Sequence, residues 1–327
     1  MRSNFQSTIA TSQFCLPVSV VLGVLSWLFL PVKDTYAWCE PDYGLWSFVP
    51  LSVQTGSLGL LSGIFFTSLV TYLMVEFCNA MVLLNTNSRM LSCTLIIIMS
   101  LSLCLHRLQP SHVVMLASLI SFFALFSSYQ NESPELSFVA HLTISAASLV
   151  CPKIIMLTPF IFLVQLYVNC LSFRTFFASL MAIIVPYWFF FVCAVCKDDI
   201  GMFTDFFRVM VDFSVPDYSV VMTEQWLMGL NIVVFFVAGC VNYLFTTSKS
   251  RTRQRMVFNT FMMHGLISLL LFLVMPNCVN VIMGMLAIDA SILCGRFWVL
   301  SNNRFTHVFF VILGLFSLVI LSVTVNM

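Results

Sequence analysis

The sequence predicts an all-α protein built as a polytopic bundle of transmembrane helices. The chain of 327 residues is 60% hydrophobic, has a mean hydropathy of +1.02, and carries only 8% charged residues, whereas soluble domains average about 25%. Its apolar runs approach the ~20 residues that a helix needs to cross a bilayer core. This composition excludes a soluble globular enzyme and a disordered chain, and a net charge of +1 gives no electrostatic footprint for nucleic acid.

Apolar segments follow one another along the whole chain, which we treat as one integral-membrane domain, 1–327. They are 14–31, 55–83, 90–105, 112–128, 138–150, 154–171, 176–195, 226–245, 258–275, 278–295 and 306–326. The first segment is too long for a signal-peptide core and is expected to stay as a membrane helix. Segment 138–150 is short, contains His141 and stops at Pro152. If it is a half-helix, the number of spans falls from about 11 to 10.

Lysine and arginine residues near the helix ends predict the orientation. The densest basic cluster lies between the eighth and ninth segments: Lys249, Arg251, Arg253 and Arg255. A cytoplasmic cluster places Arg2, Arg89, Arg174, Arg296 and Arg304 inside as well, and it leaves Lys33, Arg107, Lys153, Lys197 and Arg208 outside. We therefore expect the N-terminus inside and the C-terminus outside. With only ten spans, the N-terminal half would be inverted relative to the cluster.

Two loops on the outer side are long enough to carry function, the periplasmic loops 32–54 and 196–225. In the second, residues 199–213 place acidic and basic side chains on one helical face and phenylalanines on the rest. This pattern favours an interfacial helix lying on the membrane with its phenylalanines inserted, against the alternative of a plain connecting loop.

Two carboxylates fall within the predicted spans, and His264 is a further polar candidate there. Glu76 lies in the second segment, His264 in the ninth and Asp289 in the tenth. Such residues are costly in a membrane and are functional candidates by default. The alternatives are structural pairing, a position near the headgroups for Glu76, and a hydrogen-bonded packing role for His264. Small residues at four-residue spacing predict close helix packing, at Gly59, Gly63 and Thr67 and again at Ala287, Ser291 and Gly295.

The first outer loop combines carboxylates with aromatic residues. Asp34, Glu40 and Asp42 lie among tyrosines and tryptophans, which is typical of an interfacial belt with solvated acids. A carboxylate in this position could also act as a general base toward an acceptor hydroxyl, or hold a divalent cation against a phosphate. These three residues are therefore the candidate catalytic residues, and a divalent cation is a conceivable cofactor.

Other sequence features carry weaker functional signals. His106 and Arg107, at the turn before Pro110, are expected to form an outer basic patch that contacts a lipid phosphate or is simply solvated. Cys193 and Cys196 form a C-x-x-C pair without the context of a redox or metal site. The phosphate-loop, helical zinc-protease and α/β-hydrolase motifs do not occur, and we predict no metal site.

Three stretches resemble a family of multi-pass inner-membrane proteins of unknown function from Gram-negative Bacteroidota. They are NTNSRMLS at 85–92, AASLVCPKIIMLTPFIFL at 146–163 and LSFRTFFASLMAIIVPYWFF at 171–190. The resemblance covers about half of the chain with 284–326 included, and it implies a location and an architecture. The architecture is also similar to that of membrane glycosyltransferases that use polyprenyl-phosphate-linked sugars, in which the first outer loop bears a catalytic acid. The chain departs from that pattern because its first loop is short and its acidic pair reads C-E-P-D instead of being adjacent, and no outer C-terminal domain is expected.

The sequence leaves three functions open. The first is an inner-membrane enzyme of cell-envelope glycan or lipid-linked-sugar assembly that uses the first-loop acids. The second is a non-catalytic membrane subunit of an envelope or export complex, with membrane-protein partners. The third is a small-solute or lipid transporter that uses Asp289 and Glu76 at broken helices.

Overall fold

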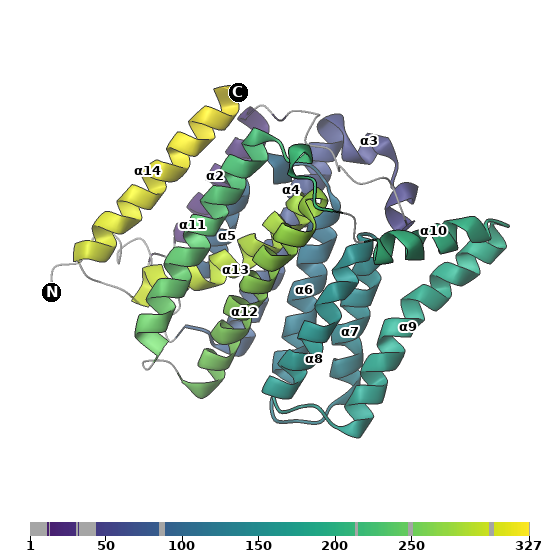
Figure 1. The fold of residues 1–327 in the computed structure, drawn as a ribbon. Coiled ribbons are helices and arrows are strands. Elements are labelled where there is room, and N and C mark those ends of the chain that lie inside the picture. Colours follow the sequence, from purple (N-terminus) through teal and green to yellow (C-terminus); the bar gives the residue numbers. More distant parts are fainter. Residues whose placement is uncertain are drawn as a thin grey trace.

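A computed structural model describes residues 12, 14–30, 32, 44–84, 89–212, 215–247, 251–300 and 304–326, and within them the chain forms helices and turns without a strand. The long helices run side by side (Figure 1). The elements are α2 (Cys15–Phe29), η2 (Gly44–Phe48), α3 (Leu51–Gln54), α4 (Gly56–Met81), α5 (Met90–Leu101), η3 (Leu103–Leu105), α6 (Pro110–Ser127), α7 (Pro134–Ser148), η4 (Pro152–Leu157), α8 (Thr158–Tyr167), α9 (Phe173–Cys196), α10 (Ile200–Val211), η5 (Tyr218–Val220), α11 (Thr223–Thr246), α12 (Thr252–Val274), η7 (Pro276–Cys278), α13 (Val279–Leu300) and α14 (Arg304–Asn326).

Each predicted apolar segment coincides with a helix. Seven of them are long and apolar enough to cross a membrane: α4, α6, α9, α11, α12, η7 with α13, and α14. The prediction of a helical, multi-pass membrane protein is therefore confirmed. Helices α2, α5 and η4 with α8 are apolar but shorter, so the predicted number of spans stays a prediction.

The segment predicted over 138–150 forms most of α7, a 15-residue helix. It begins earlier than predicted, because the Ser133 side chain caps it by accepting from the amide of Leu136. Its hydropathy is low because it contains several serines, and Ser145 and Ser148 bond to α9 instead of facing lipid. Ser145 Oγ donates to the carbonyl of Ile183 at 2.7 Å, three residues before the helix-interior Pro186, so this serine bonds to the backbone of α9 close to its proline.

Helix α13 is the centre of the bundle. Its apolar window is buried throughout, and it packs against α5, α6, α11 and α12 (Figure 1). Glycines allow these close approaches: a Cβ on Gly295 would lie 2.7 Å from the Leu91 Cα of α5, and one on Gly239 of α11 would lie 2.7 Å from the Cys294 amide. The predicted close packing of the Gly295 stripe is thus confirmed.

The bundle has two ends, and each gathers one set of helix termini. At the first, Gln254 at the start of α12 donates to the carbonyl of Val82 just after α4, and the turns after α6 and α8 are joined from Gln130 to Val168. We call this the Arg255 end. At the second, the amide of Leu45 donates to the carbonyl of Leu149 just after α7; we call this the Arg107 end. Which of the two ends faces the cytoplasm stays a prediction.

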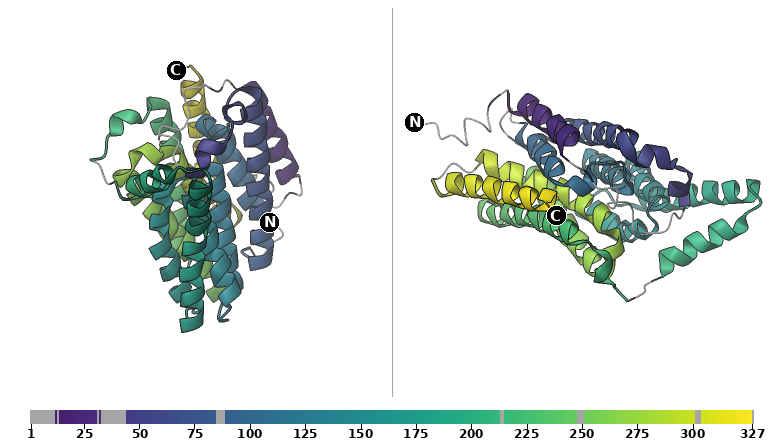
Figure 2. Two further views of the ribbon diagram at one scale, coloured as in Figure 1. Left: turned by 90° about the vertical axis from the view of Figure 1, so that its right-hand side faces the viewer. Right: turned by 90° about the horizontal axis from the view of Figure 1, so that it is seen from above.

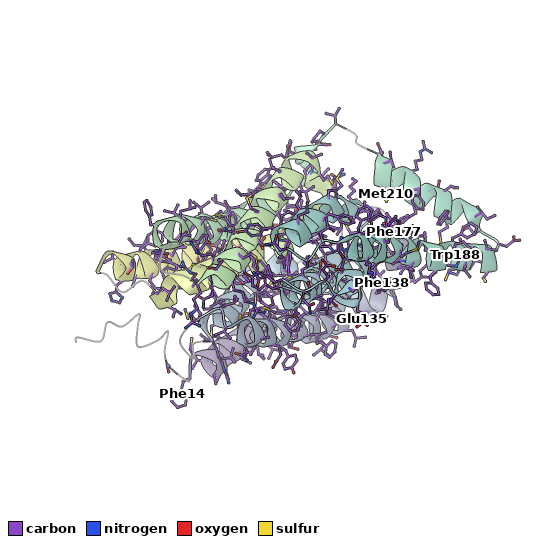
Figure 3. All side chains as sticks on the ribbon, turned by 90° about the horizontal axis from the view of Figure 1, so that it is seen from below. Phe14, Glu135, Phe138, Phe177, Trp188 and Met210 are labelled. Atoms are coloured by element: carbon purple, nitrogen blue, oxygen red, sulfur yellow. The ribbon has the colours of Figure 1, made fainter. Side chains whose placement is uncertain are left out.

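Residues 199–213 include the predicted amphipathic helix as α10, which Asp199 caps by accepting from the Met202 amide. Seen from above, α9 and α10 extend away from the rest of the bundle (Figure 2). Phe206 is fully buried and its ring contacts Phe190 of α9, so part of the phenylalanine face packs on protein. Trp188 lies on α9, at the far side of the molecule from Phe14 (Figure 3). The position of α10 on a membrane surface stays a prediction.

Candidate functional site

Two of the predicted intramembrane residues meet in the centre of the bundle. His264 of α12 places Nδ1 at 3.0 and 2.9 Å from the two carboxylate oxygens of Asp289 on α13. The side chains are 1% and 0% exposed. The residues are 25 positions apart on different segments, so the sequence identified each of them without indicating that they form a pair.

The charge of this pair follows from its surroundings. The imidazole lies against the rings of Phe122 and Phe160, with centroid distances of 5.0 and 5.8 Å. An uncompensated charge in such an apolar site is strongly unfavourable. The favoured states therefore hold one proton between the two groups and are neutral overall, either as carboxylate with imidazolium or as carboxylic acid with imidazole.

Glu76 is not part of this arrangement. It is exposed on α4, whereas Asp289 is fully buried. Helices α4 and α13 are both continuous at these residues. The expectation that the two carboxylates lie at broken helices is therefore wrong, and the transporter hypothesis stays untested.

The turn between α5 and α6 differs from the predicted basic patch. His106 is fully buried and stacks on Trp27 of α2, with ring centroids 4.2 Å apart, and the Trp27 indole nitrogen donates to the His106 carbonyl at 2.9 Å. Burial lowers the pKa of His106 to about 4, so the ring is neutral at pH 7. The prediction that His106 contacts a lipid phosphate is therefore wrong. Gly63 permits this packing, because a Cβ there would overlap the His106 carbonyl.

Arg107 has a different position at the same turn. Its side chain is half-buried, and Nη2 donates to the carbonyl of Val32 at 3.2 Å. The guanidinium therefore lies where the chain leaves α2. Its predicted contact with a lipid phosphate stays a prediction.

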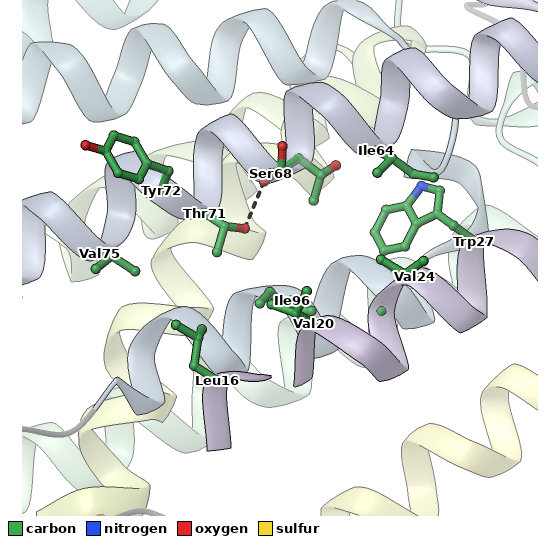
Figure 4. Close-up of a pocket in the computed structure, with 12 residues that line it drawn as sticks. Leu16, Val20, Val24, Trp27, Ile64, Ser68, Thr71, Tyr72, Val75 and Ile96 are labelled. Atoms are coloured by element: carbon green, nitrogen blue, oxygen red, sulfur yellow. Dashed lines mark hydrogen bonds between the residues drawn. The ribbon is translucent and has the colours of Figure 1, made fainter. Parts of the chain in front are cut away.

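An apolar groove runs along α2 and α4 toward this turn. It has a volume of about 310 Å³. Trp27 and Ile64 stand at one end, and Leu16 and Val75 stand at the other (Figure 4). Its lining residues are Leu16, Val20, Gly23, Val24, Trp27, Ile64, Thr67, Ser68, Thr71, Tyr72, Val75 and Ile96. The groove ends at Trp27, and because Trp27 stacks on His106, this end of the groove lies next to the turn that carries Arg107.

The candidate catalytic acids Asp34, Glu40 and Asp42 lie outside the described residues. Asp34 is two positions along the chain from Val32, the residue that accepts from Arg107. In sequence, the first of the acids therefore follows closely after the residue that Arg107 contacts.

Within the described ranges, no group of three or more histidine, cysteine or acidic side chains could hold a metal ion. Cys193 and Cys196 are exposed free thiols at the end of α9. Comparison of the chain with family models, with curated proteins and with solved structures finds no match.

Proposed function

We propose that the protein is an inner-membrane enzyme of cell-envelope glycan assembly that takes a polyprenyl-phosphate-linked sugar as its substrate. The observation that carries the proposal is the apolar groove of about 310 Å³ between α2 and α4, which ends at Trp27, next to the turn of Arg107. In this arrangement an apolar chain and its phosphate each meet a matching surface.

The groove suits the hydrocarbon part of such a substrate. Its lining on α2 extends from Leu16 to Trp27, a length of about 16 Å along a helix. That is roughly half of the hydrocarbon thickness of a bilayer. The groove therefore accommodates the part of the chain nearest the phosphate, and the rest extends into lipid.

Arg107 supplies the charge for the phosphate. A guanidinium can donate two parallel hydrogen bonds to phosphate oxygens, and it stays protonated at every physiological pH. Its half-buried side chain reaches Val32, directly after α2, so a phosphate bound there lies at the membrane-water boundary. A sugar linked to that phosphate then faces the first loop.

The first-loop acids supply the chemistry. One carboxylate among Asp34, Glu40 and Asp42 takes the proton of an acceptor hydroxyl while the hydroxyl oxygen attacks the anomeric carbon. The bond from that carbon to the phosphate oxygen breaks, and the polyprenyl phosphate leaves with the electron pair. The alternative role of these acids is to hold a divalent cation against the phosphate.

The test uses the purified protein and a polyprenyl phosphate that carries a photoreactive group. Val20→Phe narrows the groove, whereas Val21→Phe changes the neighbouring exposed residue that does not line it. Arg107→Gln removes the proposed phosphate ligand, and Arg208→Gln removes an exposed charge on α10 as its control. We expect crosslinking to fall about ten-fold in Val20→Phe and Arg107→Gln and to stay unchanged in the two controls.

A second measurement separates an enzyme from a scaffold. In cells, the triple variant Asp34→Asn, Glu40→Gln, Asp42→Asn is expected to lose the envelope glycan while the purified variant still crosslinks the probe. A triple variant with normal glycan removes the catalytic role. Equal crosslinking in all variants would show that the groove is not the substrate site, and it would favour the hypothesis of a non-catalytic subunit.

A further inference from the structure

We propose that a second groove, between α8 and α12, binds an anionic glycerophospholipid, with the acyl chain along the groove and the phosphate at Tyr167 and Arg255. This site is separate from the groove of the proposed substrate. Its ligand is a lipid of the bilayer and not a substrate.

The body of the site is apolar. The groove has a volume of about 390 Å³, and exposed Leu163 on α8 and Met263 on α12 form part of its walls. The full lining is Phe160, Leu163, Val164, Tyr167, Asn259, Thr260, Met262, Met263 and Ile267. A flexible acyl chain fits such a surface, since methionine side chains adapt to irregular shapes.

One end of this groove is polar and already ordered. Asn259 Nδ2 donates to the Tyr167 hydroxyl at 2.9 Å, and the Tyr243 hydroxyl lies 2.6 Å from Asn259 Oδ1. Asn259 is therefore held from both sides. Because the Tyr167 hydroxyl accepts from Asn259, its own proton is available for an acceptor such as a phosphate or ester oxygen of a lipid.

The charge at this end is positive. Arg255 precedes Asn259 by one helical turn and lies on the same face of α12, and long helical side chains lean toward the helix N-terminus. Its guanidinium contacts Thr252 in the first turn of α12, so the helix dipole also favours an anion there. Glu132 in the α6–α7 turn and Glu135 at the start of α7 do not line the groove.

The position in the fold separates the two lipid sites. The polar end of this groove is at the Arg255 end of the bundle, where α8 terminates and α12 begins. The groove between α2 and α4 reaches the opposite, Arg107 end. In a spanning bundle the two polar ends therefore meet different leaflets, and clusters of arginine at a membrane surface attract anionic lipids.

The experiment uses the full chain in phosphatidylcholine nanodiscs that contain a small fraction of diazirine-labelled phosphatidylglycerol, with labelled phosphatidylcholine as the neutral probe. Crosslinks are mapped by mass spectrometry. We expect phosphatidylglycerol crosslinks to concentrate on the peptides of α8 and α12. Arg255→Gln is expected to reduce them about five-fold, since one surface arginine contributes ~1 kcal/mol. Leu163→Trp, which fills the groove, is expected to reduce them by at least as much.

Two matched variants test whether the effect is local. Arg174→Gln removes an exposed charge at the same end of the bundle, and Leu166→Trp enlarges an exposed residue of α8 outside the groove. Both are expected to keep the wild-type crosslinks. Equal labelling by the two lipids, or equal loss in Arg255→Gln and Arg174→Gln, means ordinary annular lipid and overturns the proposal.

Discussion

His264 Nδ1 lies 3.0 and 2.9 Å from the two carboxylate oxygens of Asp289, and this contact joins α12 to the buried apolar stretch of α13. Both side chains are buried away from the protein surface. The pair is therefore stable as a unit that shares one proton, and each residue depends on the other for that neutrality.

Substitution of either His264 or Asp289 alone is expected to lower the free energy of unfolding by more than half of the loss seen when both are replaced. His264→Leu leaves the Asp289 carboxyl in an apolar site, and we expect the free energy of unfolding to fall by about 3–5 kcal/mol. The double variant His264→Leu, Asp289→Leu is expected to be more stable than the sum of the single effects predicts, because it removes both polar groups. Thermal unfolding in one detergent measures all the variants, and strictly additive losses would contradict the pairing.

The buried His106 is expected to make the protein sensitive to acid. Its pKa is about 4 in the folded protein and 6.5 in an ordinary environment, so the unfolded chain binds a proton between these values while the folded protein does not. The free energy of unfolding is then complete above pH 6.5 and falls as the pH drops toward 4, by about 3 kcal/mol at most. His106→Phe keeps a ring against Trp27 and removes the proton site. A variant with an equally steep pH profile would show that His106 does not cause the loss.

Glycine is expected to be required where helices touch and dispensable elsewhere. Gly295→Ala places a Cβ 2.7 Å from the backbone of Leu91, so α13 and α5 must separate, and we expect a loss of about 1–3 kcal/mol. Gly314 on α14 has open space where a Cβ would lie, with nothing within 4 Å. Gly314→Ala is expected to change stability by less than about 0.5 kcal/mol. Similar melting temperatures for both variants would argue against the close approach of α13 and α5.

The exposed thiols of α9 offer a test of orientation. Cys193 and Cys196 are exposed, whereas Cys104 and Cys294 are fully buried. In a variant with Cys39→Ser, a membrane-impermeant maleimide added to intact spheroplasts is expected to label α9, because this end is predicted to face outward. The control Cys193→Ser, Cys196→Ser should not react. Labelling that appears only after the membrane is opened would reverse the predicted sidedness.

Much of the secondary structure could be predicted because lipid imposes a simple rule. A segment in hydrocarbon must satisfy its own backbone, so apolar length identifies each helix. The rule is weakest where a helix faces protein. The serines of α7 lower its hydropathy. They are accommodated because a neighbouring helix supplies partners, as when Ser145 donates to the carbonyl of Ile183 on α9. Segment 138–150 is therefore a short apolar run because part of α7 contacts another helix instead of lipid.

The candidate sites show the same division. The sequence by itself determined that the chain is a helical membrane protein, and it singled out Asp289 and His264 because an ionisable residue in an apolar run is conspicuous. Only the tertiary structure decided that the two form a pair, that Glu76 stands apart on an exposed face, and that His106 is stacked on Trp27 instead of facing lipid. The physical reason is that hydropathy is a sum over neighbours along the chain, whereas partners and burial depend on contacts between helices that are distant in sequence.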